Sequence, residues 1–290
     1  PSVRIANTIA VVHNVIILSM DIKKFFQLVV DRGASDMYLR INAYPRARIN
    51  GRVEPISDEL IKKDEMIGAT AYLLANEIRT RVLKVNQDID FIHDEPGIGR
   101  FRVNVFIQRG TLAIVARYVH AKVRSFEELS LPGELLKLFC EEKKGLFLVC
   151  GPAGNGKSTT IASMIEYINT ISSQHILTIE DPIEFLFTDK KSLIKQRELG
   201  LDVPSYEQAL KHITQQSADI IYIGNIRDEA TMRASISATE LGMFVMTTFH
   251  TINAVQTIVR IVNFFPPHLH DEVRMQLSMI LRGTLSLRLV

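Results

Sequence analysis

The sequence predicts an α/β protein of two domains, in which a smaller α+β domain precedes a larger one built on a parallel sheet. The chain has 290 residues, which is long enough for two domains of ordinary size. From about Phe126 onward, short apolar runs alternate with helical segments, a pattern typical of parallel strands that are buried on both faces. From Asp21 to about His120 the signals are mixed and include a hairpin, which predicts an antiparallel sheet with helices.

The composition is that of a soluble globular protein. Hydrophobic residues make up 47% of the chain and charged residues 23%. The formal net charge of +2 indicates no particular partner, and because there is no long basic block we expect no nucleic acid ligand. Cys140 and Cys150 are the only cysteines, which indicates a reducing compartment and no disulfide framework.

The N-terminal residues differ from the rest of the chain. The stretch 5–20 is apolar, but Asn7, His13 and Asn14 interrupt it. It is too short and too broken for a membrane span, and it lacks the small-residue cleavage site of a signal peptide. We therefore expect residues 1–20 to form an edge strand or a poorly ordered arm. The rest of the sequence contains no candidate for a membrane span either.

The first domain is predicted to mix helices with strands. Asn50-Gly51 between alternating residues is the strongest short hairpin signal, because both turn positions need a positive φ angle. Ser57-Asp58-Glu59 is typical of a helix start and predicts a helix that runs to about Ala75. The other predicted elements are a helix at 21–30 and strands at 36–41, 87–93, 100–108 and 111–118.

The second domain is predicted to contain four parallel strands. They coincide with the short apolar runs at 146–150, 175–180, 220–223 and 243–248. In an open parallel sheet, ligands bind beyond the carboxyl ends of the strands. The residues that directly follow these four runs should therefore surround one site.

The first of these strands leads into a complete phosphate-binding motif. Gly151 to Ser158 reads G-x-x-x-x-G-K-S, and a helical segment follows at 159–165. The glycines let several backbone N–H groups face one phosphate group, and the start of the helix adds a partial positive charge. Lys157 can reach the β- and γ-phosphates of ATP, and the Ser158 hydroxyl can bind Mg²⁺. The predicted nucleotide contacts are Gly151, Gly154, Asn155, Gly156, Lys157, Ser158 and Thr159.

Chemically suitable side chains follow the other three strands. Three carboxylates lie between Glu180 and Glu184 after the second strand, and Asn225 and His250 follow the third and fourth. Carboxylates can hold Mg²⁺ through water or accept a proton from the attacking water, and a histidine can sense the γ-phosphate. An acidic turn alone is usually only solvated, and a lone histidine is more often structural. Their common place at one edge of the sheet favours a functional site.

Three further segments resemble motifs of the secretion ATPases. Residues 178–185, 196–200 and 247–251 are similar to the Asp box, a connecting motif and the His box of that superfamily. Within it, the chain most resembles the type IV pilus retraction ATPases, the PilT/PilU family, and residues 263–267 and 277–283 are more similar to the PilU branch. The resemblance extends from about residue 20 to the last residue, and it is specific because the nucleotide motifs occur in order.

The resemblance implies a fold and an activity. The family has a PAS-like N-terminal domain, here 21–120, joined to a RecA-like P-loop ATPase domain, here 121–290. It implies hydrolysis of ATP with Mg²⁺ in a hexameric ring that powers pilus retraction and twitching motility. It also implies a homo-hexamer or a mixed ring with a paralogue, in the cytoplasm at the pilus base, beside an inner-membrane platform protein.

The resemblance also implies roles for individual residues. Glu184 matches the catalytic glutamate that polarises the attacking water, and His250 matches the His-box histidine. Arg102 and Arg117 match arginines of the N-terminal domain that reach the phosphates, and guanidinium groups suit phosphate oxygens. From the residues alone, an arginine on a strand is more often a surface residue, so only the resemblance favours this role.

One position departs from the family pattern. The third strand should end in Gly-Glu, but here it ends in Gly224-Asn225, and Asp219 precedes the strand and so lies at the opposite edge of the sheet. Asparagine can bind a water but cannot act as a base, and losing such a carboxylate costs about 10²–10⁴ in rate. Two hypotheses follow: a motor ATPase, or a weakly active ATP-binding ring subunit that assists an active paralogue. A nucleic-acid motor is a third, but it would need a basic, aromatic strip that the sequence lacks.

Overall fold

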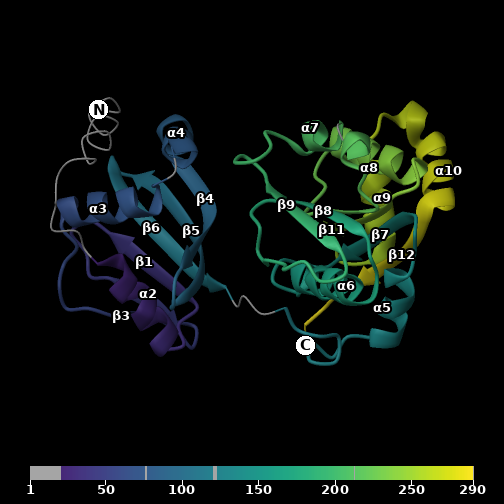
Figure 1. Ribbon diagram of the computed structural model, residues 1–290. Coiled ribbons are helices and arrows are strands. Elements are labelled where there is room, and N and C mark those ends of the chain that lie inside the picture. Colours follow the sequence, from purple (N-terminus) through teal and green to yellow (C-terminus); the bar gives the residue numbers. More distant parts are fainter. Residues whose placement is uncertain (1–20, 76, 120–122, 212, 290) are drawn as a thin grey trace. The chain divides into compact units, whose positions relative to one another are not determined.

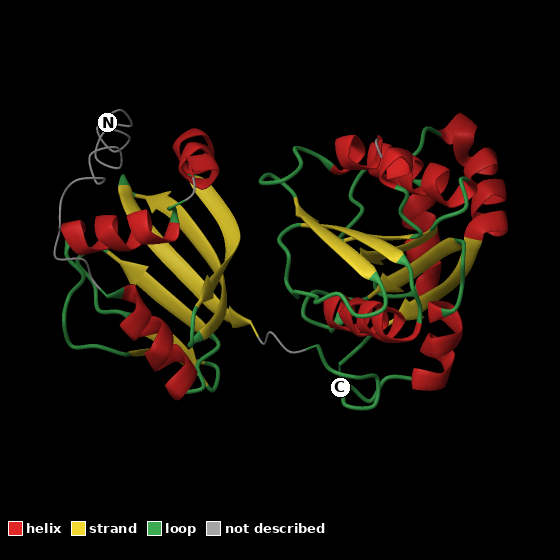
Figure 2. Cartoon of the chain, in the orientation of Figure 1, coloured by secondary structure: helices red, strands yellow, loops and turns green. Residues whose placement is uncertain are grey.

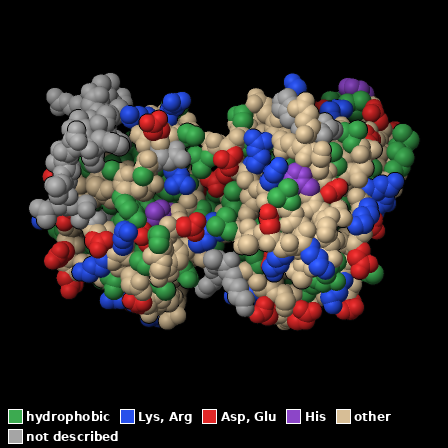
Figure 3. All heavy atoms as spheres, viewed as in Figure 1, with side chains coloured by type: hydrophobic (Ala, Val, Ile, Leu, Met, Phe, Trp, Pro, Cys, Tyr) green, Lys and Arg blue, Asp and Glu red, His purple; other side chains and the backbone are tan. Residues whose placement is uncertain are grey.

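The structure is a computed structural model that describes residues 21–75, 77–119, 123–211 and 213–289. The predicted arm at 1–20 lies outside the described residues. The chain divides into two compact units, residues 1–121 and 122–290. None of the helices within the described ranges is both long enough and apolar enough to span a membrane. Acidic and basic side chains are interspersed on the face that Figure 3 shows, in keeping with the small net charge.

The first unit is built on an antiparallel sheet of six strands, as the sequence predicts (Figure 1). The strand order is β3-β2-β1-β6-β5-β4. The turn between β2 and β3 has φ angles of 48° at Asn50 and 81° at Gly51, which is the left-handed geometry that the Asn-Gly pair predicts. The strands are β1 (Asp36–Arg40), β2 (Arg46–Ile49), β3 (Arg52–Pro55), β4 (Asp88–Glu95), β5 (Gly99–Gln108) and β6 (Thr111–Val119).

The helix that was expected from residue 57 begins later. Helix α3 spans Lys63–Leu73, and Lys62 is its N-cap, whose backbone N–H donates to Glu65 Oε2 over 2.7 Å. The preceding chain is not helical because Ile61 is buried and its backbone bonds to Asn42 and Ala43. These long-range bonds hold the segment against the loop between β1 and β2. Tertiary contacts therefore override the local helix-start signal.

The helices of the first unit cover one face of its sheet (Figure 2). The described helices are α2 (Ile22–Asp31), α3 and α4 (Glu77–Asn86), and α4 was not among the predicted elements. Their apolar residues share one core with alternate strand residues such as Met37 and Phe101. The strand residues that alternate with these core residues point to the opposite face of the sheet. That face carries Asp36, Arg102 and Arg117.

The second unit contains a six-stranded sheet in which every pair is parallel. The strand order is β12-β7-β11-β10-β8-β9. The four predicted strands match β7 (Gly145–Cys150), β8 (His175–Glu180), β10 (Ile220–Ile223) and β11 (Phe244–Phe249). The two edge strands, β9 (Leu193–Glu198) and β12 (Leu281–Ser286), were not predicted, because their mixed polarity lacks a continuous apolar run.

Helices cover both faces of the parallel sheet, as Figure 1 shows. Helices α5 (Gly133–Cys140) and α6 (Lys157–Ile171) share one apolar core with the sheet. The opposite core is formed with α7 (Tyr206–Lys211), α8 (Glu229–Glu240), α9 (Ala254–Val262) and α10 (His270–Ile280). Because both faces are buried, a ligand can bind only at the ends of the strands, and in parallel sheets it binds beyond their carboxyl ends.

Candidate nucleotide-binding site

The phosphate loop connects the end of β7 to the start of α6. Gly154 and Gly156 have φ angles of 77° and 79°, which suit glycine, and Gly156 is the N-cap of α6. Gly156 O accepts hydrogen bonds from both the N–H and the Oγ1 of Thr160, at 2.8 and 2.9 Å. The loop therefore carries its backbone directly onto the first turn of a 15-residue helix, where phosphate groups are favoured.

The side chain of Lys157 lies across the loop. It is 6% exposed, and Nζ donates hydrogen bonds to Gly151 O at 2.9 Å and Pro152 O at 2.8 Å. Burial lowers the pKa of this ammonium group, and the carboxylate of Glu184 opposes the shift. Lys157 and Glu184 are thus close enough to interact electrostatically, as a shared site requires.

Glu180 is the last residue of β8 and is 6% exposed. Its Oε1 accepts hydrogen bonds from Thr178 Oγ1 at 2.6 Å and from Gln196 Nε2 at 3.2 Å. Burial raises the pKa of this carboxyl group to about 7, and the charge of Glu184 acts in the same direction. In the sequence Glu180 is only one of three neighbouring carboxylates, because its hydrogen bond to Gln196 depends on the pairing of β8 with β9.

Asn225 follows β10 at the same edge of the sheet and is half-buried. The preceding Gly224 is fixed on both sides, since its N–H donates to Ile179 O at 2.8 Å and its carbonyl accepts from Thr248 Oγ1. Asp219 lies at the opposite edge, where its Oδ2 accepts from the N–H of His175 at 2.8 Å. Asp219 therefore cannot replace the missing acid.

His250 directly follows β11. Partial burial lowers the pKa of its imidazole, and the positive charges of Lys157, Arg227 and Arg260 act in the same direction. The ring is therefore neutral at pH 7 and can donate or accept a hydrogen bond. The carboxyl ends of four neighbouring strands thus bring Lys157, Glu184, Asn225 and His250 to one edge of the sheet.

The oxygen donors at this edge fit Mg²⁺. The Ser158 hydroxyl and the carboxylates of Asp181 and Glu184 are hard ligands of the kind this ion prefers. Among the described residues, no group of three or more His, Cys, Asp or Glu side chains could hold a metal on its own. The protein would therefore supply few ligands, and Mg²⁺ would take the others from phosphate and water, as it commonly does.

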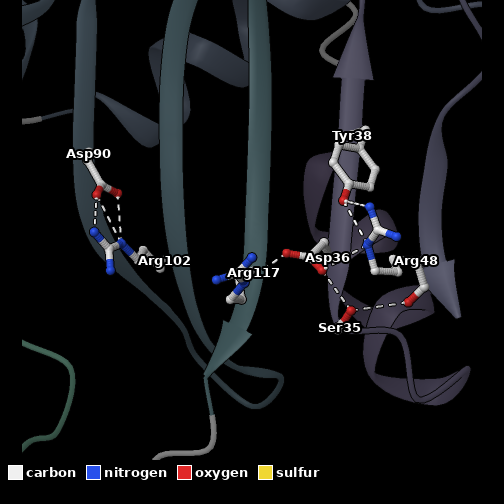
Figure 4. Close-up of polar contacts among 7 residues, drawn as sticks. All are labelled: Ser35, Asp36, Tyr38, Arg48, Asp90, Arg102 and Arg117. Atoms are coloured by element: carbon white, nitrogen blue, oxygen red, sulfur yellow. Dashed lines mark hydrogen bonds and ion pairs between the residues drawn. The ribbon is translucent and has the colours of Figure 1, made fainter. Parts of the chain in front are cut away.

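Arg102 and Arg117 belong to the first unit and oppose each other across β5 and β6. Because opposite residues of an antiparallel pair point to the same face, the two guanidinium groups share the face opposite the described helices. Figure 4 shows that each has its own carboxylate partner. Arg102 Nε lies 2.9 Å from Asp90 Oδ2, and Arg117 Nε lies 2.8 Å from Asp36 Oδ1.

Asp36 is the centre of a wider network (Figure 4). It is 4% exposed, accepts a hydrogen bond from Ser35 Oγ at 2.7 Å, and also pairs with Arg48 Nε at 3.6 Å. Arg48 in turn donates to the Tyr38 hydroxyl at 3.0 Å. Burial acts to raise the pKa of Asp36, but the hydrogen bonds from Ser35 and Arg117 and the two positive charges outweigh it and lower the pKa.

Comparisons with known proteins all indicate the same family. The model of the type II/IV secretion system protein family matches residues 13–290. The type IV pilus ATPase PilU of Pseudomonas aeruginosa is 38% identical over 271 residues, which cover 93% of this chain and 70% of that protein. The type IV pilus retraction ATPase PilT of the same organism is also 38% identical, over 93% of this chain and 78% of its own.

Solved structures agree with this result. The pilus retraction motor PilT with bound ADP superposes with a TM-score of 0.85 and 42% identity, over 92% of this chain and 77% of that one. The ATPase DotB of Legionella pneumophila has a TM-score of 0.78 at 23% identity, over 91% and 75% of the two chains, and so supports the fold alone.

Proposed function

Because the chain belongs to the type II/IV secretion system protein family, and within it to the PilT/PilU secretion ATPases, we propose that it is an ATP-hydrolysing motor subunit for type IV pilus retraction. The observation that carries this proposal is the common edge of the parallel sheet. There the phosphate loop with Lys157 lies within electrostatic reach of both Glu184 and His250. In this proposal the second unit is a RecA-like domain and the first a PAS-like domain.

The residues divide the chemistry between them. The backbone of Gly154 and Gly156 and the ammonium group of Lys157 hold the phosphates. The Ser158 hydroxyl would supply one ligand to Mg²⁺. The ion, when bound, neutralises charge on the phosphate oxygens. Glu184 orients the attacking water and accepts its proton. Neutral His250 hydrogen-bonds to the γ-phosphate and so distinguishes ATP from ADP.

The arginines of the first unit complete the pocket in this proposal. Arg102 and Arg117 neutralise the charge that develops on the γ-phosphate, and such an arginine contributes about 10³–10⁵ in rate. Their neighbouring places on one face let both reach the same polyphosphate. The two units would close over ATP and open after hydrolysis, and this motion in a ring would drive retraction.

The proposed assembly follows from the family. It is a ring of six copies, or a mixed ring with a paralogue, in the cytoplasm at the base of the pilus. The ring would act on a platform protein of the inner membrane.

A weakly active ring subunit is the second candidate, and one observation favours it. Asn225 occupies the carboxyl end of β10, where an acid is expected, and the nearby Asp219 is bound at the opposite edge. Such a subunit would bind ATP through the same loop and depend on an active partner for turnover.

Steady-state ATP hydrolysis and fluorescent-ADP binding test the main proposal. We expect Lys157→Ala to abolish both, and Glu184→Gln to keep binding but lower turnover by about 10²–10⁴. Glu141→Gln is the matched control, because Glu141 is an exposed carboxylate at the end of α5, near the opposite edge of the sheet. Undiminished turnover in Glu184→Gln would refute the assigned role of Glu184.

A further inference from the structure

The chain after β12 runs beside the phosphate loop. Strand β12 pairs in parallel with β7 up to the pair Ser286 and Cys150. The next residue, Leu287, donates its N–H to Cys150 O at 2.8 Å. Leu287 also packs against the core that α5 and α6 share with the sheet, on the side where the yellow end of the chain leaves β12 in Figure 1. We call Leu287–Leu289 the C-terminal segment.

The start of the phosphate loop is shaped to this segment. A Cβ atom on Gly151 would lie 2.5 Å from Leu287 O, and its φ angle is 155°. Only glycine therefore allows the backbones to approach so closely. The contact involves a carbonyl oxygen of the main chain, which cannot rotate away as a side chain could.

The crest of the loop holds the far end of the segment through one side chain. Asn155 Oδ1 accepts a hydrogen bond from the N–H of Leu289 at 2.8 Å, between residues 134 positions apart. The same amide group donates from Nδ2 to Ala153 O at 3.2 Å, within the loop. Asn155 thus binds the loop with one atom and the segment with the other.

The side chain of Leu289 is 70% exposed, so it contributes little packing at this end. The backbone bond to Asn155 is therefore the contact that places Leu289. Lys157 also donates to the carbonyls of Gly151 and Pro152, and it would have to give up these hydrogen bonds to bind phosphate. Asn155 and the segment remain to hold the loop in its phosphate-binding form.

We propose that Asn155 is a positioning residue that ties the phosphate loop to the main chain of the C-terminal segment, so that this main chain supports the loop. The inference rests on the proposed function of the loop, and it adds a coupling. If the segment stabilises the loop, nucleotide binding must stabilise the segment to the same extent. The state of the phosphate loop is then transmitted to the end of β12.

Two variants at one position separate the backbone bond from the side chain. Leu289→Pro removes the N–H that Asn155 accepts, whereas Leu289→Ala keeps it and removes only the exposed side chain. We expect Leu289→Pro and Asn155→Ala each to weaken fluorescent-ADP binding roughly fivefold, the value of one hydrogen bond. Leu289→Ala should bind like the wild type, and the double variant Asn155→Ala/Leu289→Pro should bind no more weakly than Asn155→Ala.

Unchanged affinity of Leu289→Pro, or effects that multiply in the double variant, would overturn the proposal. Hydrogen exchange at the Leu289 amide gives a second readout that does not depend on turnover or on proline. We expect exchange to slow when ADP binds and to be fast in Asn155→Ala. Equal protection of this amide in Asn155→Ala and the wild type would also overturn it. Wild-type protein that fails to bind ADP would instead refute the proposed function.

Discussion

The buried carboxylate of Asp36 accepts a hydrogen bond from Nε of Arg117 across β1 and β6, with 2.8 Å between the two atoms. The residues are direct partners in the sheet register, and Asp36 is also the register partner of Arg48 on its other side. One acidic side chain therefore pairs with two guanidinium groups, on the face of the sheet opposite the described helices.

Asp36→Asn should destabilise the first unit and change its response to acid. The folded pKa of Asp36 is below its ordinary value of 3.8, so the charged form stabilises the fold above that pH, and this contribution is lost as pH falls through the folded value. We expect the variant to lose about 1–3 kcal/mol at pH 7. Urea denaturation at pH 7 and pH 3 measures this, and the gap between the two proteins should narrow at pH 3. A gap of constant size would contradict the assigned cause.

Arg117→Ala and Arg102→Ala should lower ATP turnover by about 10³ or more while ADP binding changes far less. The reason is that the proposed arginines act on charge that develops in the transition state. Arg52→Ala is the matched control, since Arg52 is an exposed arginine on the edge strand β3. Steady-state hydrolysis and ADP titration separate the two effects. Equal losses in the Arg52 variant would point to a general effect on the first unit.

Glu180→Gln should remove a pH dependence of stability. The folded pKa of about 7 exceeds the ordinary value of 4.5, so the folded state keeps a proton that the unfolded chain releases. Stability of the wild type should therefore fall as pH rises from 4.5 to 7, by about 3 kcal/mol from this group. Glutamine keeps the polar contacts without the charge, so denaturant midpoints at pH 5 and pH 8 should differ less in the variant. Parallel pH profiles would exclude a shifted Glu180.

Asn225→Glu should raise turnover if the missing acid limits hydrolysis. The expected gain reaches about 10²–10⁴ if a carboxylate there acts as a base. Asn225→Gln is the matched control, because it has the same size as glutamate and no charge. Single-turnover hydrolysis measures the step directly. If the two variants hydrolyse ATP at the rate of the wild type, position 225 does not limit turnover and the weak-subunit hypothesis loses its basis.

The central features of the fold could be predicted because each depends on residues that are contiguous in the sequence. Strand β7 is a continuous apolar run, β11 is a buried run of apolar residues and two threonines, and the Asn50-Gly51 turn needs only two residues. The start of α3 was misplaced because Ile61 bonds to Asn42 and Ala43, which local propensity does not reveal.

The site divides in the same way. Gly151 to Ser158 is a local motif. The parallel topology places Glu184 and His250 at the same end of the sheet as this motif. The burial of Glu180 depends on an edge strand without an apolar run, and the contact between Asn155 and Leu289 joins distant parts of the sequence. Neither relationship leaves a pattern in the chain.

The pairing of Arg102 with Asp90 and of Arg117 with Asp36 would limit which anions can bind to these two arginines. An incoming anion meets cations that are already satisfied, so it has to displace a carboxylate from each arginine or share it. A singly charged anion gains little from that exchange, whereas the clustered charges of a polyphosphate can outcompete both carboxylates together. In the proposed role, this face would favour ligands of high charge density, and the two arginines would return to their carboxylates when such a ligand leaves.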